Sequence, residues 1–180
     1  MLTVRRSLTT AQRQNYSKLI LDTLAAQPFY QRAHTVFCYA AMEDEVQTYA
    51  LLRRALGEGK LVYLPYMTRQ RGVMRAVRLP DMEALVPGAC GILTVRNESE
   101  DYADPADIDC VIVPGAAFGR QGQRLGMGAG YYDRFLRQAA QAFFVAAAFH
   151  CQLIEDIPMA EHDCFMDAIV TEHEVILCNS

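Results

Sequence analysis

The sequence lacks a hydrophobic run long enough to cross a lipid bilayer. Its longest apolar run extends only from Ala142 to Phe149, whereas a membrane-spanning helix needs roughly 20 such residues. The N-terminal residues Met-Leu-Thr-Val-Arg-Arg turn polar at once, so we expect no signal peptide. These two absences predict a soluble protein of the cytoplasm with no membrane partner.

Cysteines in metal-binding or redox spacings are also missing. Six cysteines are present, but no two form a C-x-x-C pair and none has a zinc-like spacing with histidine. Some lie inside apolar runs, as Cys38 and Cys110 do, which favours buried free thiols in a reducing compartment over disulfides. The histidines do not cluster in the sequence either, and they stand at His34, His150, His162 and His173.

An excess of positive charge is absent as well. The formal net charge is -4, which argues against a nucleic-acid partner because such proteins usually present a basic face. A few local arginines and backbone N–H groups could still bind a small anion. With 180 residues, 52% hydrophobic and 21% charged, and with no repeat or visible boundary, the chain is expected to form one domain over residues 1–180.

Helix and strand patterns alternate along the chain. Thr9-Thr10-Ala11-Gln12 is typical of a capping box, and the helix that follows should bury one face before Pro28 ends it. That face is expected to contain Tyr16, Leu19, Ile20, Thr23 and Leu24. Further helices are predicted over residues 48–56, closed by Gly57 and Gly59, and over residues 131–141.

Strands are predicted where short apolar runs are rich in β-branched and aromatic residues. They cover residues 35–40, 61–64, 73–79, 110–113, 143–149, 167–171 and 175–177, with Pro65 ending the second and Pro114 the fourth. Residues 80–107, rich in Pro, Gly, Asp and Glu, are expected to form a long irregular connection. Strands that are apolar on both faces and alternate with helices predict an α/β fold with a mostly parallel sheet covered by helices.

A glycine-rich segment follows the strand that ends at Val113. Glycines let the backbone approach a ligand closely, and successive N–H groups can then converge on an anion. The predicted helix after Gly130 adds its positive end, and Arg124 and Arg134 bracket the loop and could contact phosphate oxygens. Asp133 could bind Mg²⁺ beside phosphates, or it could only stabilise the helix N-terminus. The pattern matches neither the Walker A nor the G-x-G-x-x-G motif, so a purely structural loop stays possible at this point.

The same segment resembles the signature of the 5-formyltetrahydrofolate cyclo-ligase (methenyltetrahydrofolate synthetase) family. The likeness rests on Val113 to Phe118, followed by Gly122-Gln123-Arg124-Leu125-Gly126-Met127-Gly128-Ala129-Gly130-Tyr131-Tyr132-Asp133-Arg134-Phe135-Leu136. Tyr39-Ala40 with the segment from Asp44 to Thr48, the strand Gly59–Pro65, and pieces between Gln152 and Glu172 occur in the family's order. The likeness covers nearly the whole chain, and the long loop motif is highly specific.

The resemblance implies a three-layer α/β/α sandwich, similar to the architecture of sugar-phosphate isomerases and CoA transferases. It also implies an enzyme that converts 5-formyltetrahydrofolate to 5,10-methenyltetrahydrofolate, with ATP split to ADP and phosphate and Mg²⁺ required. The expected partners are the reduced folate and ATP, and the expected assembly is a monomer or a weak dimer.

Residue roles also come from the resemblance, position by position. Arg124 and Asp133 would be catalytic, Asp133 and Asp163 would hold Mg²⁺, and Ala40, Glu45 and Tyr132 would bind the folate. ATP would lie against Arg124, Leu125, Gly126, Met127, Gly128, Ala129, Gly130, Tyr131 and Tyr132. By themselves, Glu45 could instead belong to a solvated acidic turn and Asp163 could only cap a turn.

The chain departs from the family's pattern in two places. The N-terminal Lys-x-x-x-Arg segment that reaches ATP in relatives is missing; Arg5 or Arg6 could replace it, or both could be solvated at a flexible terminus. Ala129 stands where many relatives have Lys or Gly, so ATP could be held less tightly. A non-catalytic folate- or nucleotide-binding protein on the same scaffold, and a sugar-phosphate isomerase or acyl-CoA transferase, are the alternatives to the cyclo-ligase.

Overall fold

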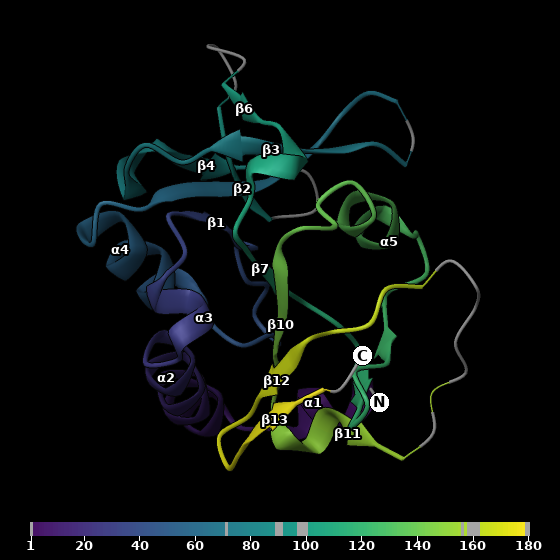
Figure 1. Ribbon diagram of the computed structural model, residues 1–180. Helices are drawn as coiled ribbons and strands as arrows, with labels where there is room; N and C mark the ends of the chain where they lie inside the picture. The colour runs from purple at the N-terminus through teal and green to yellow at the C-terminus, as the bar shows by residue number, and fades with distance from the viewer. Residues whose placement is uncertain are drawn as a thin grey trace.

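A twisted sheet forms the centre of the computed structural model, which describes residues 2–70, 72–88, 92–96, 101–155, 157 and 163–178. Its strands follow the order β13-β12-β10-β7-β1-β2-β3-β6 (Figure 1). The strands are β1 (Thr35–Phe37), β2 (Leu61–Met67), β3 (Met74–Arg78), β6 (Tyr102–Ala103), β7 (Cys110–Val113), β10 (Phe143–Ala147), β12 (Ala168–Val170) and β13 (Val175–Leu177). The pairs between β12, β10, β7, β1 and β2 are parallel, and the outer strands β13, β3 and β6 are antiparallel.

Helices cover both faces of this sheet. In Figure 1, α2, α3 and α4 lie on one side and α5 on the other. The helices are α1 (Leu2–Ser7), α2 (Thr10–Ala25), α3 (Pro28–Gln31), α4 (Tyr49–Gly57) and α5 (Tyr131–Leu136), with short 3-10 turns η1 (Met82–Ala84), η3 (Pro105–Asp107) and η4 (His150–Gln152). Within the described residues, no helix is both long and apolar enough to cross a membrane.

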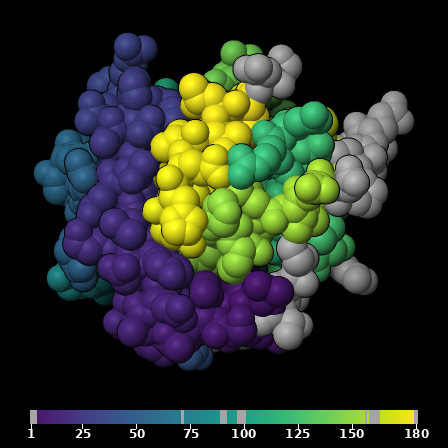
Figure 2. All heavy atoms as spheres, turned by 90° about the horizontal axis from the view of Figure 1, so that it is seen from below, coloured from purple at the N-terminus to yellow at the C-terminus, as the bar shows by residue number. Residues whose placement is uncertain are grey.

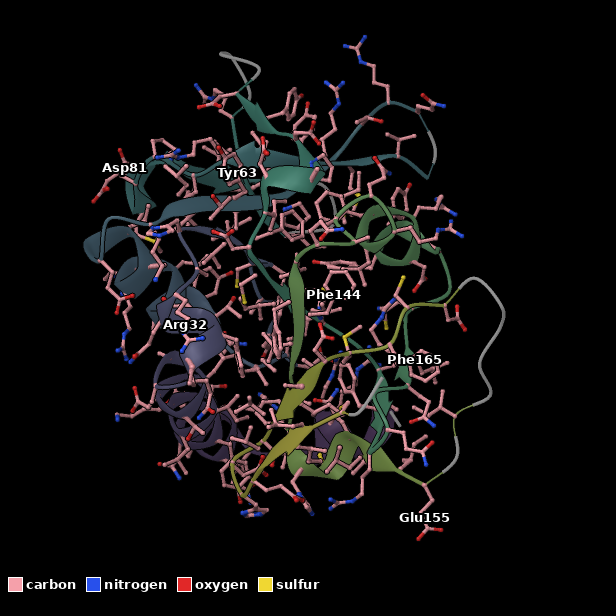
Figure 3. All side chains as sticks on the ribbon, viewed as in Figure 1. Arg32, Tyr63, Asp81, Phe144, Glu155 and Phe165 are labelled. Carbon is pink, nitrogen blue, oxygen red and sulfur yellow. The ribbon has the colours of Figure 1, made fainter. Side chains whose placement is uncertain are left out.

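Alternate residues of the central strands pack into two separate cores. Val36, Val62 and Ile112 belong to the cluster that contains the α2 and α4 side chains. Phe37 and Val111 belong to the cluster that contains Phe135 and Leu136 of α5, as do Tyr63 and Phe144, which are labelled in Figure 3. Because side chains alternate across a strand, burial on both faces confirms the predicted α/β class with a mostly parallel, helix-covered sheet.

The capping box predicted for the first long helix is present. Thr9 accepts a hydrogen bond from the N–H of Gln12 (3.2 Å), and the Gln12 side chain accepts one from the N–H of Thr9 (2.9 Å). The predicted face is partly wrong, because Leu19 is 44% exposed. The buried residues are Ser17, Ile20, Leu21, Leu24 and Ala25, a stripe with the i, i+3, i+4, i+7 and i+8 spacing of a helix.

Pro65 does not end β2, as the sequence predicted; the strand continues to Met67. Leu61 donates to His34, and the carbonyl of Tyr63 accepts from Cys38, so alternate residues of β2 face β1. The backbone of Pro65 would also face β1, but the pairing of β2 with β1 stops at Tyr63. No hydrogen bond to β1 is therefore needed from Pro65, which has no N–H, while β3 continues to pair with the other edge of β2.

The connection over residues 80–107 is not irregular throughout, and that prediction is wrong in part. Strands β4 (Leu85–Pro87) and β5 (Leu93–Val95) pair antiparallel as a hairpin, and β5 packs near β2. The glycine-rich segment also contains short strands, because β8 (Ala117–Gly119) pairs with β9 (Arg124–Leu125) and with β11 (Leu153–Ile154). The helix predicted over residues 131–141 ends earlier, at Leu136, and the strands predicted over 35–40 and 143–149 end at Phe37 and Ala147.

The thiols match the sequence interpretation in part. Cys38, Cys110, Cys151, Cys164 and Cys178 are free within the described residues, but only Cys38 and Cys110 are buried and the other three are partly exposed. Cys90 lies outside the described residues. Burial raises the pKa of the Cys110 thiol to about 12, which the charge of Lys60 offsets only in part. Such thiols behave as apolar core groups and are poor nucleophiles.

Candidate functional site

The site lies where the strand order of the sheet reverses. The chain passes from β1 to β2 on one side and later returns to β7 on the other side of β1. In parallel α/β sheets, ligands bind beyond the carboxyl ends of strands at such a switch point. Here those ends carry Tyr39 and Ala40 after β1, and Pro114 and Gly115 after β7, and all four residues line one cavity.

This cavity has a volume of about 500 Å³ and is lined largely by apolar groups. Its charged lining residues are Glu45, Arg124 and Asp133. The other lining residues are Tyr39, Ala40, Met42, Pro65, Tyr66, Met67, Gly88, Ile92, Leu93, Thr94, Pro114, Gly115, Gly126, Met127, Ala129, Gly130, Tyr131 and Tyr132. An apolar cleft of this size with a few converging polar groups is typical of a small-molecule site.

The glycine loop forms one wall of the cavity. Gly128 and Gly130 have φ values of 89° and 65°, which favour glycine, and Gly130 is the N-cap of α5. Of the expected nucleotide-binding residues, Arg124, Gly126, Met127, Ala129, Gly130, Tyr131 and Tyr132 line the cavity, whereas Leu125 and Gly128 do not. Leu125 is instead 42% exposed.

Arg134 does not present its guanidinium to the cavity, as the sequence suggested that it could. Its Nη2 donates to the carbonyl of Ala129 (2.7 Å) and its Nε to the carbonyl of Gly72 (2.8 Å). Arg134 therefore ties the glycine loop to the turn between β2 and β3. The backbone of Ala129 takes part in this link even though its side chain carries no charge.

Arg124 and Asp133 form a pair at the end of the glycine loop. Arg124 Nη2 donates to Asp133 Oδ1, and Arg124 Nη1 donates to the carbonyl of Pro114 (3.2 Å). The Arg124 side chain is 4% exposed and that of Asp133 is 24% exposed. A nearly buried guanidinium thus lies beside a carboxylate that still reaches the cavity.

Glu45 lines the same cavity from the segment that follows β1 and is nearly buried, at 8% exposure. It is not part of a solvated acidic turn, because its Oε2 accepts from the N–H of Met42 (2.9 Å). Burial raises the pKa of Glu45, and the bond from Met42 and the charge of Arg5 offset this only partly. Ala40 and Tyr132 line the same cavity, and the buried hydroxyl oxygen of Tyr132 has no hydrogen-bond partner among the described residues.

Asp163 is not among the residues that line the cavity. Its sequence neighbour Cys164 lies with its Sγ 3.9 Å from the carbonyl oxygen of Asp133. Burial raises the pKa of the Cys164 thiol, and the charges of Asp133 and Asp163 add to this. In the described part of the chain, no group of three or more His, Cys, Asp or Glu side chains is arranged to hold a metal ion. His162 lies outside the described residues, and His150 and His173 contact each other with ring centroids 4.8 Å apart.

Sequence reasoning missed the wall that the β4–β5 hairpin supplies through Gly88, Ile92, Leu93 and Thr94. A signal for it existed. Leu85-Val86-Pro87-Gly88 and Ile92-Leu93-Thr94-Val95 are two short apolar runs with a glycine after the first, which is typical of a hairpin.

Two glycines with similar backbone angles provide a test of how this segment is held. A Cβ at Gly122 (φ 95°) would lie 2.4 Å from the carbonyl oxygen of Met166, whereas one at Gly128 (φ 89°) would meet nothing within 4 Å. Gly122→Ala should lower the free energy of unfolding by about 3 kcal/mol or more, and Gly128→Ala by about 1 kcal/mol, because only the first adds a clash to the backbone strain. Urea unfolding followed by circular dichroism measures both, and equal losses would contradict this assignment.

Comparison with known proteins identifies the family of the chain. The family model described as the 5-formyltetrahydrofolate cyclo-ligase family matches residues 1–172. The Escherichia coli K12 5-formyltetrahydrofolate cyclo-ligase is 32% identical over 174 residues, which cover 95% of this chain and 96% of that protein. The mouse protein of the same name is 30% identical over 93% of this chain and 87% of its own length.

Solved structures show the same fold. The NMR structure of Aquifex aeolicus 5,10-methenyltetrahydrofolate synthetase superposes with a TM-score of 0.86 at 29% identity, covering 99% of this chain and 89% of that one. A Mycoplasma pneumoniae 5,10-methenyltetrahydrofolate synthetase has a TM-score of 0.76 at 21% identity, covering 95% and 93%. With a family model that spans most of the chain and relatives at this identity, the protein belongs to the 5-formyltetrahydrofolate cyclo-ligase family.

Proposed function

We propose that this protein is an enzyme that converts 5-formyltetrahydrofolate to 5,10-methenyltetrahydrofolate and splits ATP to ADP and phosphate. The observation that carries the proposal is a single cavity lined by two different sets of polar groups. One set is the buried carboxylate Glu45, and the other is the glycine loop with the Arg124–Asp133 pair. Two ligands of different chemistry can therefore meet in one apolar space.

The folate would bind on the Glu45 side. A pterin presents two N–H donors side by side on its aminopyrimidinone edge, and a carboxylate accepts such a pair. The buried setting of Glu45 strengthens the interaction, since few waters compete for it. Ala40 offers only packing. The buried Tyr132 hydroxyl has no partner in the described part of the chain, so a bound ligand could supply its hydrogen bond.

ATP would bind along the loop from Arg124 to Tyr132, through backbone N–H groups rather than a lysine. Arg124 would place positive charge next to the transferred phosphate, and its bonds to Asp133 and Pro114 fix its orientation in advance. Because Arg134 is engaged with Ala129 and Gly72, we assign it to holding the loop and not to contacting phosphate.

Asp133 fits a Mg²⁺ ligand, because its partly exposed carboxylate lines the cavity beside the loop, and Mg²⁺ is usually held by one or two carboxylates together with substrate phosphates. Asp163 is proposed as the second carboxylate. A bound Mg²⁺ would neutralise charge on the phosphate oxygens and orient them.

The chemistry explains why the enzyme needs these groups. A formamide carbonyl is a poor electrophile, and its oxygen is a poor leaving group. Transfer of the γ-phosphate to that oxygen makes it a good leaving group, so the neighbouring aniline nitrogen can attack the formyl carbon. The ring then closes as phosphate leaves and the nitrogen loses its proton. For such a reaction the protein mainly positions the reactants and stabilises charge, so no side-chain nucleophile is required.

Incubation of the purified protein with 5-formyltetrahydrofolate, ATP and Mg²⁺ should generate the near-ultraviolet absorbance of the methenyl product. Omission of any one component should abolish the signal. Folded protein that binds the folate yet forms no product at high enzyme concentration would support the non-catalytic alternative. Turnover of a sugar phosphate without ATP would support an isomerase.

A further inference from the structure

Arg5 is a buried cation that the proposed reaction does not yet use. It lies in α1, and its side chain is 2% exposed. Helix α1 packs against η4, and in Figure 2 the N-terminal segment, purple, lies against the segment near residue 150, lime. Arg5 is therefore neither solvated at a flexible terminus nor placed among the residues that line the cavity.

The contacts of Arg5 are with the Asp44–Glu45 segment and with Gly115. Its Nη2 lies 2.8 Å from Asp44 Oδ2, and its Nη1 lies 3.9 Å from Glu45 Oε1. The same Nη1 donates to the carbonyl of Gly115 at 3.4 Å. Glu45 and Gly115 both line the cavity, so Arg5 lies directly behind the wall proposed to bind the folate.

Burial of the Arg5 guanidinium would destabilise the fold if no negative charge lay beside it. A buried guanidinium is unfavourable unless it is paired, and removal of one partner leaves an uncompensated charge. Asp44 is the close partner: its burial opposes ionisation, but the hydrogen bonds from Arg5 and Arg6 outweigh this and lower the pKa of Asp44. The backbone turn is fixed independently, because Gln152 Nε2 also donates to the Gly115 carbonyl (2.8 Å).

We propose that Arg5 is a positioning residue that acts through Glu45, holding this carboxylate in place and balancing its charge while touching neither substrate. The proposal rests on the assignment of Glu45 to folate binding. We do not assign Arg5 to ATP binding, because Arg5 contacts the Asp44–Glu45 segment and Gly115 and not the glycine loop.

The charged and titratable groups around Glu45 give this role a pH signature. They are Arg5 from α1, Asp44 beside it, Tyr39 after β1, Tyr49 of α4 and Tyr132 of α5. Of these groups, Arg5 carries the positive charge. Burial already raises the pKa of Glu45, so loss of Arg5 should raise it further, and folate affinity should then begin to fall at a higher pH as the solution is acidified.

The test compares Arg5→Met, Arg5→Lys and the control Arg6→Met. Arg6 also contacts Asp44, at 3.2 Å, but its side chain is 66% exposed. Arg5→Met should raise the Kd for 5-formyltetrahydrofolate, measured by calorimetry without ATP, by ~10- to 100-fold. Arg5→Lys should recover most of this loss. The KM for ATP should stay within about threefold in both, and Arg6→Met should change the folate Kd less than about threefold.

A double-mutant cycle with Glu45→Gln decides whether Arg5 acts through Glu45. The effect of Arg5→Met on folate binding should largely disappear in the Glu45→Gln background, because the partner is already neutral. The proposal would be overturned if Arg5→Met had its full effect on folate binding in the Glu45→Gln background, or if it raised the KM for ATP in parallel. It would also be overturned if the pH at which folate affinity falls on acidification were the same in Arg5→Met as in the wild type. If Arg5→Met does not fold, as judged by circular dichroism, Arg5→Gln takes its place in the cycle, because it removes the charge and keeps hydrogen-bonding groups for Asp44. Wild-type protein that binds no folate would instead contradict the proposed function itself.

Discussion

Asp133→Asn should lower kcat by roughly 10³-fold while the chain stays folded. Asparagine keeps the shape of the side chain but cannot neutralise Arg124 or provide the anionic oxygen that we propose for Mg²⁺. Loss of one preorganised electrostatic group in an active site typically lowers kcat by ~10²- to 10³-fold, and loss of the metal ligand adds to this. Initial rates at saturating ATP and folate, taken across a Mg²⁺ titration, measure the effect.

The control for this variant is Asp22→Asn. Asp22 pairs with Lys18 at 2.6 Å, but its side chain is 59% exposed and the pair lies along the outer surface of α2. This control should keep full activity, because an exposed pair contributes little. Asp133→Asn with more than a tenth of the wild-type kcat and an unchanged Mg²⁺ requirement would refute the metal assignment.

Glu45→Gln should weaken the binding of 5-formyltetrahydrofolate by ~30- to 1000-fold, the range expected when one partner of a buried charged hydrogen bond is removed. The amide presents one acceptor and one donor where the pterin needs two acceptors. The KM for ATP should change little, because the groups that we propose for ATP belong to the glycine loop and not to the segment that holds Glu45. Glu43→Gln, an exposed neighbour, is the matched control and should bind normally.

The same substitution should not lower stability at pH 7. Because burial raises the pKa of Glu45 above its usual value, its favourable contribution to folding is present at low pH and is lost as pH rises through the folded-state pKa. The ionised carboxylate is thus unfavourable for folding at neutral pH, and a neutral amide should leave Tm unchanged or higher. A clear fall in Tm together with normal folate binding would mean that Glu45 serves the fold rather than the ligand.

Local sequence patterns predicted the features that depend on local physics. Burial of Val36 and Phe37 on opposite faces of β1 follows from an apolar run, and the Thr9 cap follows from its spacing to Gln12. The glycine loop was recognisable because its motif is long. Each of these signals lies within a few residues, so neither long-range pairing nor solvent exposure had to be known.

What the sequence could not provide depends on contacts between distant segments. Arg5 meets Asp44 and Gly115 only after α1 packs beside η4, and nothing near Arg5 in the chain distinguishes it from the exposed Arg6. Arg134 lies next to the loop motif, yet its bond to Gly72 depends on where the β2–β3 turn lies. Pro65 remains in its strand only because β1 ends earlier.

The structure narrows the set of groups that could bind phosphate at the loop. Ala129 supplies no charge, and both nearby arginines are committed to protein groups: Arg134 to two carbonyls, and Arg124 to Asp133 and Pro114. Phosphate binding would therefore rest on backbone N–H groups, on the Arg124 charge and on the metal. Such a loop would be preorganised for the proposed nucleotide, because the bonds of Arg134 to Gly72 and Ala129 are already formed without a ligand.

The most direct test of the account is the coupling between the two halves of the reaction in one cavity. ADP formation and the methenyl absorbance should be followed together in a single sample, with Mg²⁺ present and with the folate either added or omitted. We expect one ADP for each methenyl product and no ADP formation without the folate. ADP release that does not depend on 5-formyltetrahydrofolate, or methenyl product formed without ADP, would contradict it.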